Sequence, residues 1–155
     1  MYEIENCKAK FTAGQAAEVA GVEYHHVNHW AKTGLIRPSV QEADGSDSLR
    51  VYSFADVVAM RVIGELRSVG FSCGSLKSVA EHIQSRRYKS IGDMVLLGSI
   101  DEDMREVGLD GFQSSLRSKA KTFAWALNLR TIVEEVDEAA LKRVKATRGR
   151  ASAVV

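Results

Sequence analysis

The sequence predicts an α+β fold in which an N-terminal winged helix-turn-helix is followed by a small strand-helix-strand-helix module. Three observations lead to this class. Four segments of the first half have helical start signals or apolar residues at helical spacing, a turn-forming cluster separates the second from the third, and apolar stretches after Arg86 have strand-like composition. We divide the 155 residues into a domain at 1–87, a module at 88–144 and a basic flexible tail at 145–155.

The first two helices are expected on either side of a tight turn. Thr12 is a hydroxyl N-cap, and Gln15 completes a capping box for a short helix that ends at Gly21. A second helix is expected to end at Gly34. Its apolar side chains can share one face: Val22, Val27, Trp30 and Ala31. Two short helices joined by a glycine-containing turn are typical of a helix-turn-helix unit.

A β-hairpin and two further helices complete the expected domain. The cluster ADGSDS lies between extended stretches at 35–40 and 49–52, which favours a hairpin with a polar loop. Ser53 is the next N-cap and Asp56 its acidic partner, for a helix capped at Gly70. The fourth helix is expected from Cys73 to about residue 83.

The second half predicts two strands, MVLL and TFAWALNL, with a short helix in FQSSLRSK between them and a helix at 131–144 after them. An exposed two-stranded sheet is not stable alone, so we expect this module to form a dimer. The same side chains could instead line a small-molecule effector pocket. The candidate residues for this dimer or effector module are Phe123, Trp125, Leu127, Leu129, Ile132 and Val136.

Composition excludes several classes of protein. Apolar residues make up 45% of the chain and charged residues 26%, which is typical of a globular protein. Two cysteines, Cys7 and Cys73, are too few for a disulfide framework or a four-ligand zinc site. The N-terminal stretch MYEIENCKAKF has charged residues throughout, so we expect no signal peptide, and no window reaches the roughly 18 apolar residues that a membrane helix needs. We expect a cytoplasmic protein with no membrane partner.

Enzymatic motifs are also absent. The sequence has no phosphate-cradling glycine motif, no G-x-S-x-G and no H-E-x-x-H, so we expect neither an enzyme nor a cofactor. His25 and His29 share one helix face, but a metal site needs three or four ligands, so we expect no metal.

Three stretches of the sequence contain recognisable motifs. Their occurrence in this order is more specific for one family than any single motif is. FTAGQAAEVAGVEYHHVNHWAKTGLIRPS has a capped helix, a Gly-Val turn and Gly-Leu-Ile-x-Pro; LRVYSFADV has Arg-x-Tyr-Ser; MRVIGELRSVGFSCGSLKSVAEHI has a Gly-Phe-Ser turn between helices. Together, over about residues 11–83, they resemble the MerR family of bacterial transcription regulators. More weakly, the second half looks like actinobacterial MerR-type regulators with a short C-terminal segment that is not a coiled coil.

The resemblance implies that double-stranded DNA is the partner, with the second helix in the major groove and the wing on the backbone or minor groove. It also implies a nucleoid-associated homodimer that binds an inverted repeat and regulates transcription. Two other classes stay open: an architectural, excisionase-like protein that bends DNA, and an antitoxin-like adaptor that binds a protein partner through the C-terminal module. The candidate DNA-binding residues are Thr12, Tyr24, His25, His26, Asn28, His29, Lys32, Arg37, Arg50 and Tyr52.

The second helix departs from the family pattern. Asn28, His29 and Trp30 stand where the family usually has Arg-Tyr-Tyr, so a fixed positive charge is absent. The amide of Asn28 can make two hydrogen bonds to adenine, or can simply be solvated. An unperturbed imidazole titrates near 6.5, so DNA affinity is predicted to rise as the pH falls toward 6.

Positive charge gathers around this helix and the wing. The stretch from Tyr24 to Lys89 contains nine basic and six acidic residues, although the formal net charge of the whole chain is only +1. Arg37 and Arg50, at the two ends of the wing, are the best candidates for phosphate or minor-groove contacts. Asp44 and Asp47 make the wing tip acidic, so we expect the tip to point away from DNA or to be mobile.

Overall fold

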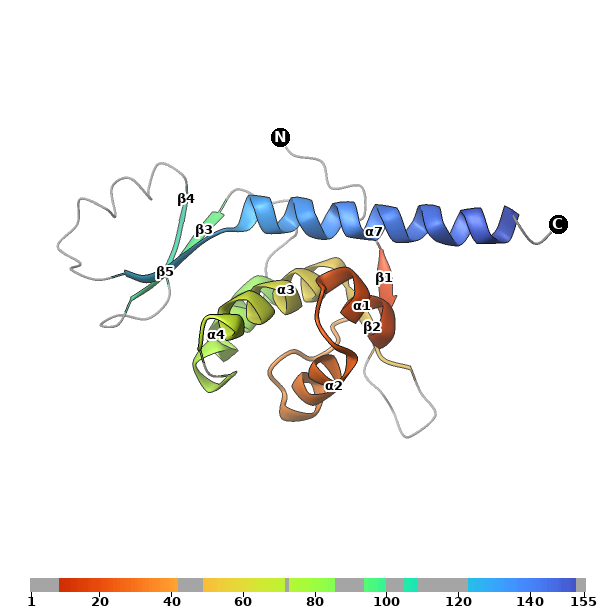
Figure 1. The fold of residues 1–155 in the computed structure, drawn as a ribbon. Helices are drawn as coiled ribbons and strands as arrows, with labels where there is room; N and C mark the ends of the chain where they lie inside the picture. Colours follow the sequence, from red (N-terminus) through yellow and green to blue (C-terminus); the bar gives the residue numbers. More distant parts are fainter. Residues whose placement is uncertain are drawn as a thin grey trace.

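The computed structural model describes residues 9–41, 49–71, 73–85, 94–99, 105–108 and 123–152. Helix α7 lies across α1 and α3, and α2 lies on the side of the domain away from α7 (Figure 1). In chain order the elements are β1 (Lys10–Thr12), α1 (Ala13–Ala20), α2 (Tyr24–Thr33), β2 (Val51–Ser53), α3 (Phe54–Ser68), α4 (Cys73–Ser85), β3 (Met94–Ser99), β4 (Arg105–Gly108), β5 (Phe123–Asn128) and α7 (Leu129–Ser152).

The helix-start signals of the first half are confirmed. The Thr12 hydroxyl accepts from the backbone N–H of Gln15 at 3.4 Å, and the Gln15 side chain accepts from the Thr12 N–H at 3.1 Å. Ser53 and Asp56 form the same reciprocal box at the start of α3. Each box satisfies two backbone donors that a helix leaves without an internal partner.

The end of α3 is a two-bond glycine motif. Gly70 has φ +104°, its N–H donates to the carbonyl of Arg67 at 3.0 Å, and the Phe71 N–H donates to the carbonyl of Leu66 at 3.2 Å. These are the bonds of a Schellman motif, in which glycine lies one residue beyond the helix cap, here Val69. The motif redirects the chain from α3 toward α4.

The wing differs from the expected hairpin. Strand β2 pairs antiparallel with β1, a strand that the sequence pattern did not predict, and in the described part of the wing an isolated bridge between Gln41 and Val51 joins its two sides. Residues 35–40 form no strand, because Pro38 has no N–H and the Ser39 N–H donates to Asp56 at 2.8 Å. The acidic tip lies outside the described residues.

The C-terminal region also differs from the prediction. Its described strands form an antiparallel sheet in the order β4-β3-β5, and β4 was not predicted. The helix expected in FQSSLRSK lies outside the described residues. Leu129 begins α7 instead of ending a strand, and α7 continues to Ser152, so most of the predicted flexible tail is helical. Lysine, arginine and alanine in that stretch have high helix propensity, which the prediction of a flexible tail did not take into account.

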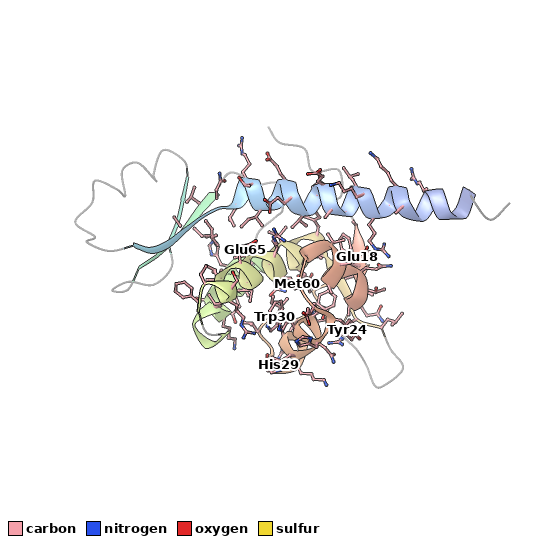
Figure 2. All side chains as sticks on the ribbon, viewed as in Figure 1. Glu18, Tyr24, His29, Trp30, Met60 and Glu65 are labelled. Atoms are coloured by element: carbon pink, nitrogen blue, oxygen red, sulfur yellow. The ribbon has the colours of Figure 1, made fainter. Side chains whose placement is uncertain are left out.

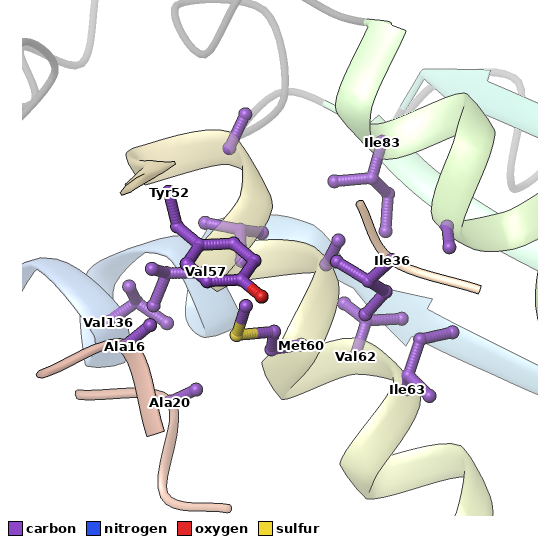
Figure 3. Close-up of a cluster of buried hydrophobic side chains, with 14 of the residues drawn as sticks. Ala16, Ala20, Ile36, Tyr52, Val57, Met60, Val62, Ile63, Ile83 and Val136 are labelled. Carbon is purple, nitrogen blue, oxygen red and sulfur yellow. The ribbon is translucent and has the colours of Figure 1, made fainter. Parts of the chain in front are cut away.

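One hydrophobic core joins α7 to the N-terminal helices. Val136 belongs to the same cluster of buried side chains as Ala16, Val57 and Met60 (Figure 3). The predicted dimer or effector residues Leu129, Ile132 and Val136 belong to this cluster, and none is more than 7% exposed. In this structure they are therefore core residues.

Among the described residues, ion pairs connect α7 to the N-terminal domain. The Arg61 guanidinium lies 3.1 Å from Glu135 of α7 and 3.1 Å from Glu65, and it donates to the carbonyl of Ala20 at 3.5 Å. Arg143 of α7 lies 3.3 Å from Glu18 of α1. The acidic partners are half or more exposed, so each pair contributes little free energy, and their main effect is to set how α7 lies on α1 and α3.

Gly21→Ala is expected to lower the free energy of unfolding by about 1–3 kcal/mol. Gly21 has φ +70°, a left-handed conformation that alanine resists, and an added Cβ would lie 2.7 Å from Nη1 of Arg61. Denaturant unfolding measures the change. Gly14→Ala is the matched control on the same helix, because a Cβ at Gly14 meets nothing within 4 Å; it is expected to be neutral or slightly stabilising. Equal effects of the two substitutions would contradict the explanation.

Candidate nucleic-acid interface

Helix α2 has one buried face and one polar, accessible face. Val27 and Trp30 are each 1% exposed and anchor the helix in the core. Tyr24 is 55% exposed, and Figure 2 shows Tyr24 and His29 on the part of the domain farthest from α7. The accessible side chains of the helix and its N-cap are Glu23, Tyr24, His25, His29, Lys32 and Thr33, with His26 and Asn28 partly buried. This arrangement presents several hydrogen-bonding groups on one outward face.

The start of α2 carries stacked rings and no side-chain cap. Glu23 occupies the N-cap position without a side-chain hydrogen bond to the helix, and its carboxylate lies 3.1 Å from Nδ1 of His25. The His26 ring is 4.2 Å from the His25 ring and stacks on Trp30 at 5.7 Å between centroids. Partial burial, then the neighbouring His25, Arg67 and His29, lower the pKa of His26, while Glu23 acts in the opposite direction.

His26 also lines a cleft of about 450 Å³ between the α1–α2 turn and α3. Trp30 forms part of its wall, and Nε1 of Trp30 is buried without a hydrogen-bond partner among the described residues. A Cβ added at Gly64 would lie 2.8 Å from Val22, so α3 approaches the turn closely at one end of the cleft. This close packing fixes the position of the turn that precedes α2.

Arg50 and Asn28 are in direct contact. The Arg50 guanidinium donates from Nη2 to Oδ1 of Asn28, and both side chains are partly buried. Both were predicted as separate DNA contacts, and no sequence signal links residues that are 22 positions apart. The structure therefore joins the base of the wing to the middle of α2.

The remaining residues that were predicted to contact DNA differ in their surroundings: some are exposed, one caps a helix and one is buried. Lys32 and Arg37 are exposed, and the backbone carbonyl of Arg37 accepts a hydrogen bond from Gln84 of α4 at 2.8 Å. The Thr12 hydroxyl caps α1. Tyr52 is fully buried and its hydroxyl has no accessible surface, so its prediction as a DNA contact is wrong for this conformation. Burial raises the pKa of Tyr52, and the positive charge of Arg50 opposes that effect.

Asp56 holds three segments together at the base of the interface. Besides capping α3, its carboxylate accepts from the N–H and the hydroxyl of Ser39, at 2.8 and 2.7 Å, and from Gln84 at 2.9 Å. Asp56 itself is fully buried. The sequence pattern predicted only the cap, because the other partners come from segments that are distant in the chain.

The described residues contain neither a metal-binding cluster nor a membrane-spanning helix. No three or more histidine, cysteine, aspartate or glutamate side chains among them gather closely enough to hold a metal ion. In that same part of the chain, no helix combines the length and apolar character needed to cross a membrane.

Comparison with known proteins points to one family. Residues 11–83 match the family described as MerR HTH family regulatory protein. Over 81 residues the chain is 31% identical to uncharacterized HTH-type transcriptional regulators of Mycobacterium bovis and Mycobacterium tuberculosis, covering 52% of this chain and 36% of theirs. Over 66 residues it is 35% identical to the HTH-type transcriptional regulator HmrR of Sinorhizobium medicae, covering 43% of each. The match thus spans less than half the length of these relatives.

Proposed function

Residues 11–83 are a MerR-family helix-turn-helix domain, and on that premise we propose that this protein is a sequence-specific DNA-binding transcriptional regulator. In this proposal α2 enters the major groove and the wing contacts the backbone or the minor groove. The members of this family are DNA-binding regulators and not enzymes, which agrees with the absence of enzymatic motifs from the sequence.

The observation that carries the proposal is the outward face of α2. A helix that reads DNA needs donors and acceptors on an accessible face and an apolar anchor on the other. Tyr24, His29 and Lys32 are accessible, while Val27 and Trp30 hold the helix in the core.

A homodimer on an inverted repeat completes the proposal. Because Leu129, Ile132 and Val136 are buried against α1 and α3, a partner would contact other surfaces, such as the outer face of α7 or an edge of the β4-β3-β5 sheet. Two-fold symmetry would then place two α2 helices in successive turns of one face of the duplex.

Two measurements test the function: selection of bound DNA duplexes from a random pool, and the mass of the protein–DNA complex in solution. We expect one inverted sequence to be enriched and two chains to bind each duplex. Enrichment of nothing, with no binding at low salt, would refute the proposal. Cooperative coating of direct repeats would favour the architectural reading, and a second polypeptide that purifies with the chain would favour the adaptor reading.

Arg37→Ala is expected to weaken binding to all DNA sequences by a similar factor and to reduce the slope of log affinity against log salt by about one unit. Arg37 is exposed at the entry to the wing, and its backbone is held by Gln84, so its charge is suited to a phosphate. Affinity measured at four salt concentrations gives the slope. Lys142→Ala removes the same charge from α7 and should leave the slope unchanged. If the slope is unchanged in Arg37→Ala, Arg37 does not contact a DNA phosphate.

DNA affinity is expected to rise by about three- to tenfold between pH 8 and pH 6 at constant salt, because protonated imidazoles on α2 attract phosphates. His25→Gln combined with His29→Gln should abolish most of this rise. The lowered pKa of His26 delays its own contribution to more acidic pH. The same shift makes the fold slightly less stable as the pH falls below 6.5, since the unfolded chain binds that proton more readily. Equal affinity at both pH values would contradict the prediction.

A further inference from the structure

The contact between Arg50 and Asn28 restricts which atoms Asn28 can offer to DNA. A guanidinium group has five N–H donors and no acceptor, so the amide atom that faces Arg50 has to be the oxygen. The NH2 group of the amide then remains as the free hydrogen-bonding group of that side chain. Asn28 is therefore oriented before any DNA arrives.

The wing holds Arg50 in the position that makes this contact. The next residue, Val51, pairs with Thr12 of β1 on one side and forms the bridge to Gln41 on the other. The Val51 N–H donates to the Gln41 carbonyl at 2.8 Å. With its neighbour bonded on both sides, the backbone from which Arg50 projects has little freedom.

An asparagine that reads adenine uses both halves of its amide: the oxygen accepts from N6 and the NH2 group donates to N7. When Arg50 already donates to the oxygen, this two-bond pattern loses its acceptor or has to share it. A donor-only side chain fits guanine better, because N7 and O6 of guanine are both acceptors in the major groove.

We propose that Arg50 is a positioning residue that fixes Asn28 as a hydrogen-bond donor, so that Asn28 selects guanine over adenine at one base pair of the site. This proposal rests on the proposed DNA-binding function and adds to it the chemistry of one recognised base. It replaces the expectation that Asn28 reads adenine. The wing thereby contributes to sequence specificity through α2, in addition to any contact that it makes with DNA itself.

The test measures the affinity of the full chain for its selected duplex and for duplexes that carry each of the three other base pairs at one position at a time. Asn28→Ala should relax preference at a single position, where the wild type prefers guanine by about tenfold. Arg50→Ala should shift that same position toward adenine, and Arg50→Lys, which keeps one charged donor, should largely restore guanine. In the double variant Arg50→Ala/Asn28→Ala the preference should equal that of Asn28→Ala alone.

Asn28→Asp separates reading from scaffolding. Its carboxylate still accepts from Arg50 but has no donor, so preference for guanine should be lost and cytosine, whose N4 group donates, should gain. If Asn28 only held Arg50 in place, this variant would keep the wild-type preference, and the proposal would be wrong. Arg37→Ala is the control, since it is expected to weaken every sequence alike. Thermal melting of each variant verifies that it is folded.

The failures of the inference and of the function are distinguishable. Wild-type binding with adenine preferred at the Asn28 position, or an Arg50→Ala variant that weakens all four bases equally, would overturn the inference and leave the regulator proposal intact. A wild-type chain that enriches no sequence would overturn both.

Discussion

Asp56→Ala is expected to lower the free energy of unfolding by about 3–4 kcal/mol and the melting temperature by about 10 °C. The carboxylate is fully buried and accepts hydrogen bonds from Ser39, Ser53 and Gln84. Its removal leaves several of these donors without an acceptor in a site that water does not reach easily. The loss therefore exceeds that of an ordinary helix cap, which is about 1 kcal/mol.

Urea unfolding followed by circular dichroism measures this effect. Glu81→Ala is the matched control, because Glu81 is an exposed carboxylate on the neighbouring α4 and should change stability by less than about 0.5 kcal/mol. Ser53→Ala, which removes the hydroxyl that accepts from the Asp56 N–H and from the Ser39 hydroxyl but keeps the Asp56 carboxylate, is expected to cost about 1 kcal/mol. A loss of less than 1 kcal/mol in Asp56→Ala would show that the links to Ser39 and Gln84 contribute nothing to stability.

Val136→Asp is expected to destabilise the protein by about 4 kcal/mol or more, or to release α7 from the domain. Val136 is 1% exposed and packs in the core that α7 shares with α1 and α3 (Figure 3). A carboxylate at this position would have no partner in an apolar environment. Thermal melting and limited proteolysis distinguish global unfolding from cleavage confined to a released α7.

Thr131→Asp provides the control on the same helix, because Thr131 is exposed and an acidic residue in the first turn of α7 is favourable. A Val136→Asp chain that melts normally but loses its dimer would contradict the core assignment. That outcome would return Val136 to the interface between copies that the sequence suggested.

Features that depend on neighbouring residues were predicted well. Thr12 with Gln15 and Ser53 with Asp56 start α1 and α3 at the expected places, and Gly21 and Gly34 end α1 and α2 in the left-handed conformation. Each of these signals acts within one helical turn, so its physical chemistry is contained in a few consecutive residues. The family resemblance over residues 11–83 is likewise a property of the sequence and is confirmed.

Features that depend on distant residues were predicted poorly. Tyr52 lies in the Arg-x-Tyr-Ser motif and was predicted to contact DNA, yet its side chain is buried in the core. Strand β1 is only three residues long, too short for an alternating pattern to reveal it before its pairing with β2 is known. The apolar residues of α7 predicted burial, but not whether the cover would be a partner chain or the N-terminal helices.

The sequence by itself determined where the helices of the N-terminal half begin and end, and which family pattern residues 11–83 match, because caps and motifs are local. Only the tertiary structure decided that α7 completes the core, that Asp56 joins the wing to α4, and that Arg50 orients Asn28. Each of these depends on residues at least 17 positions apart that meet only when the core forms. Hydrogen bonds and burial of this kind depend on shape complementarity between elements, which one-dimensional periodicity does not contain.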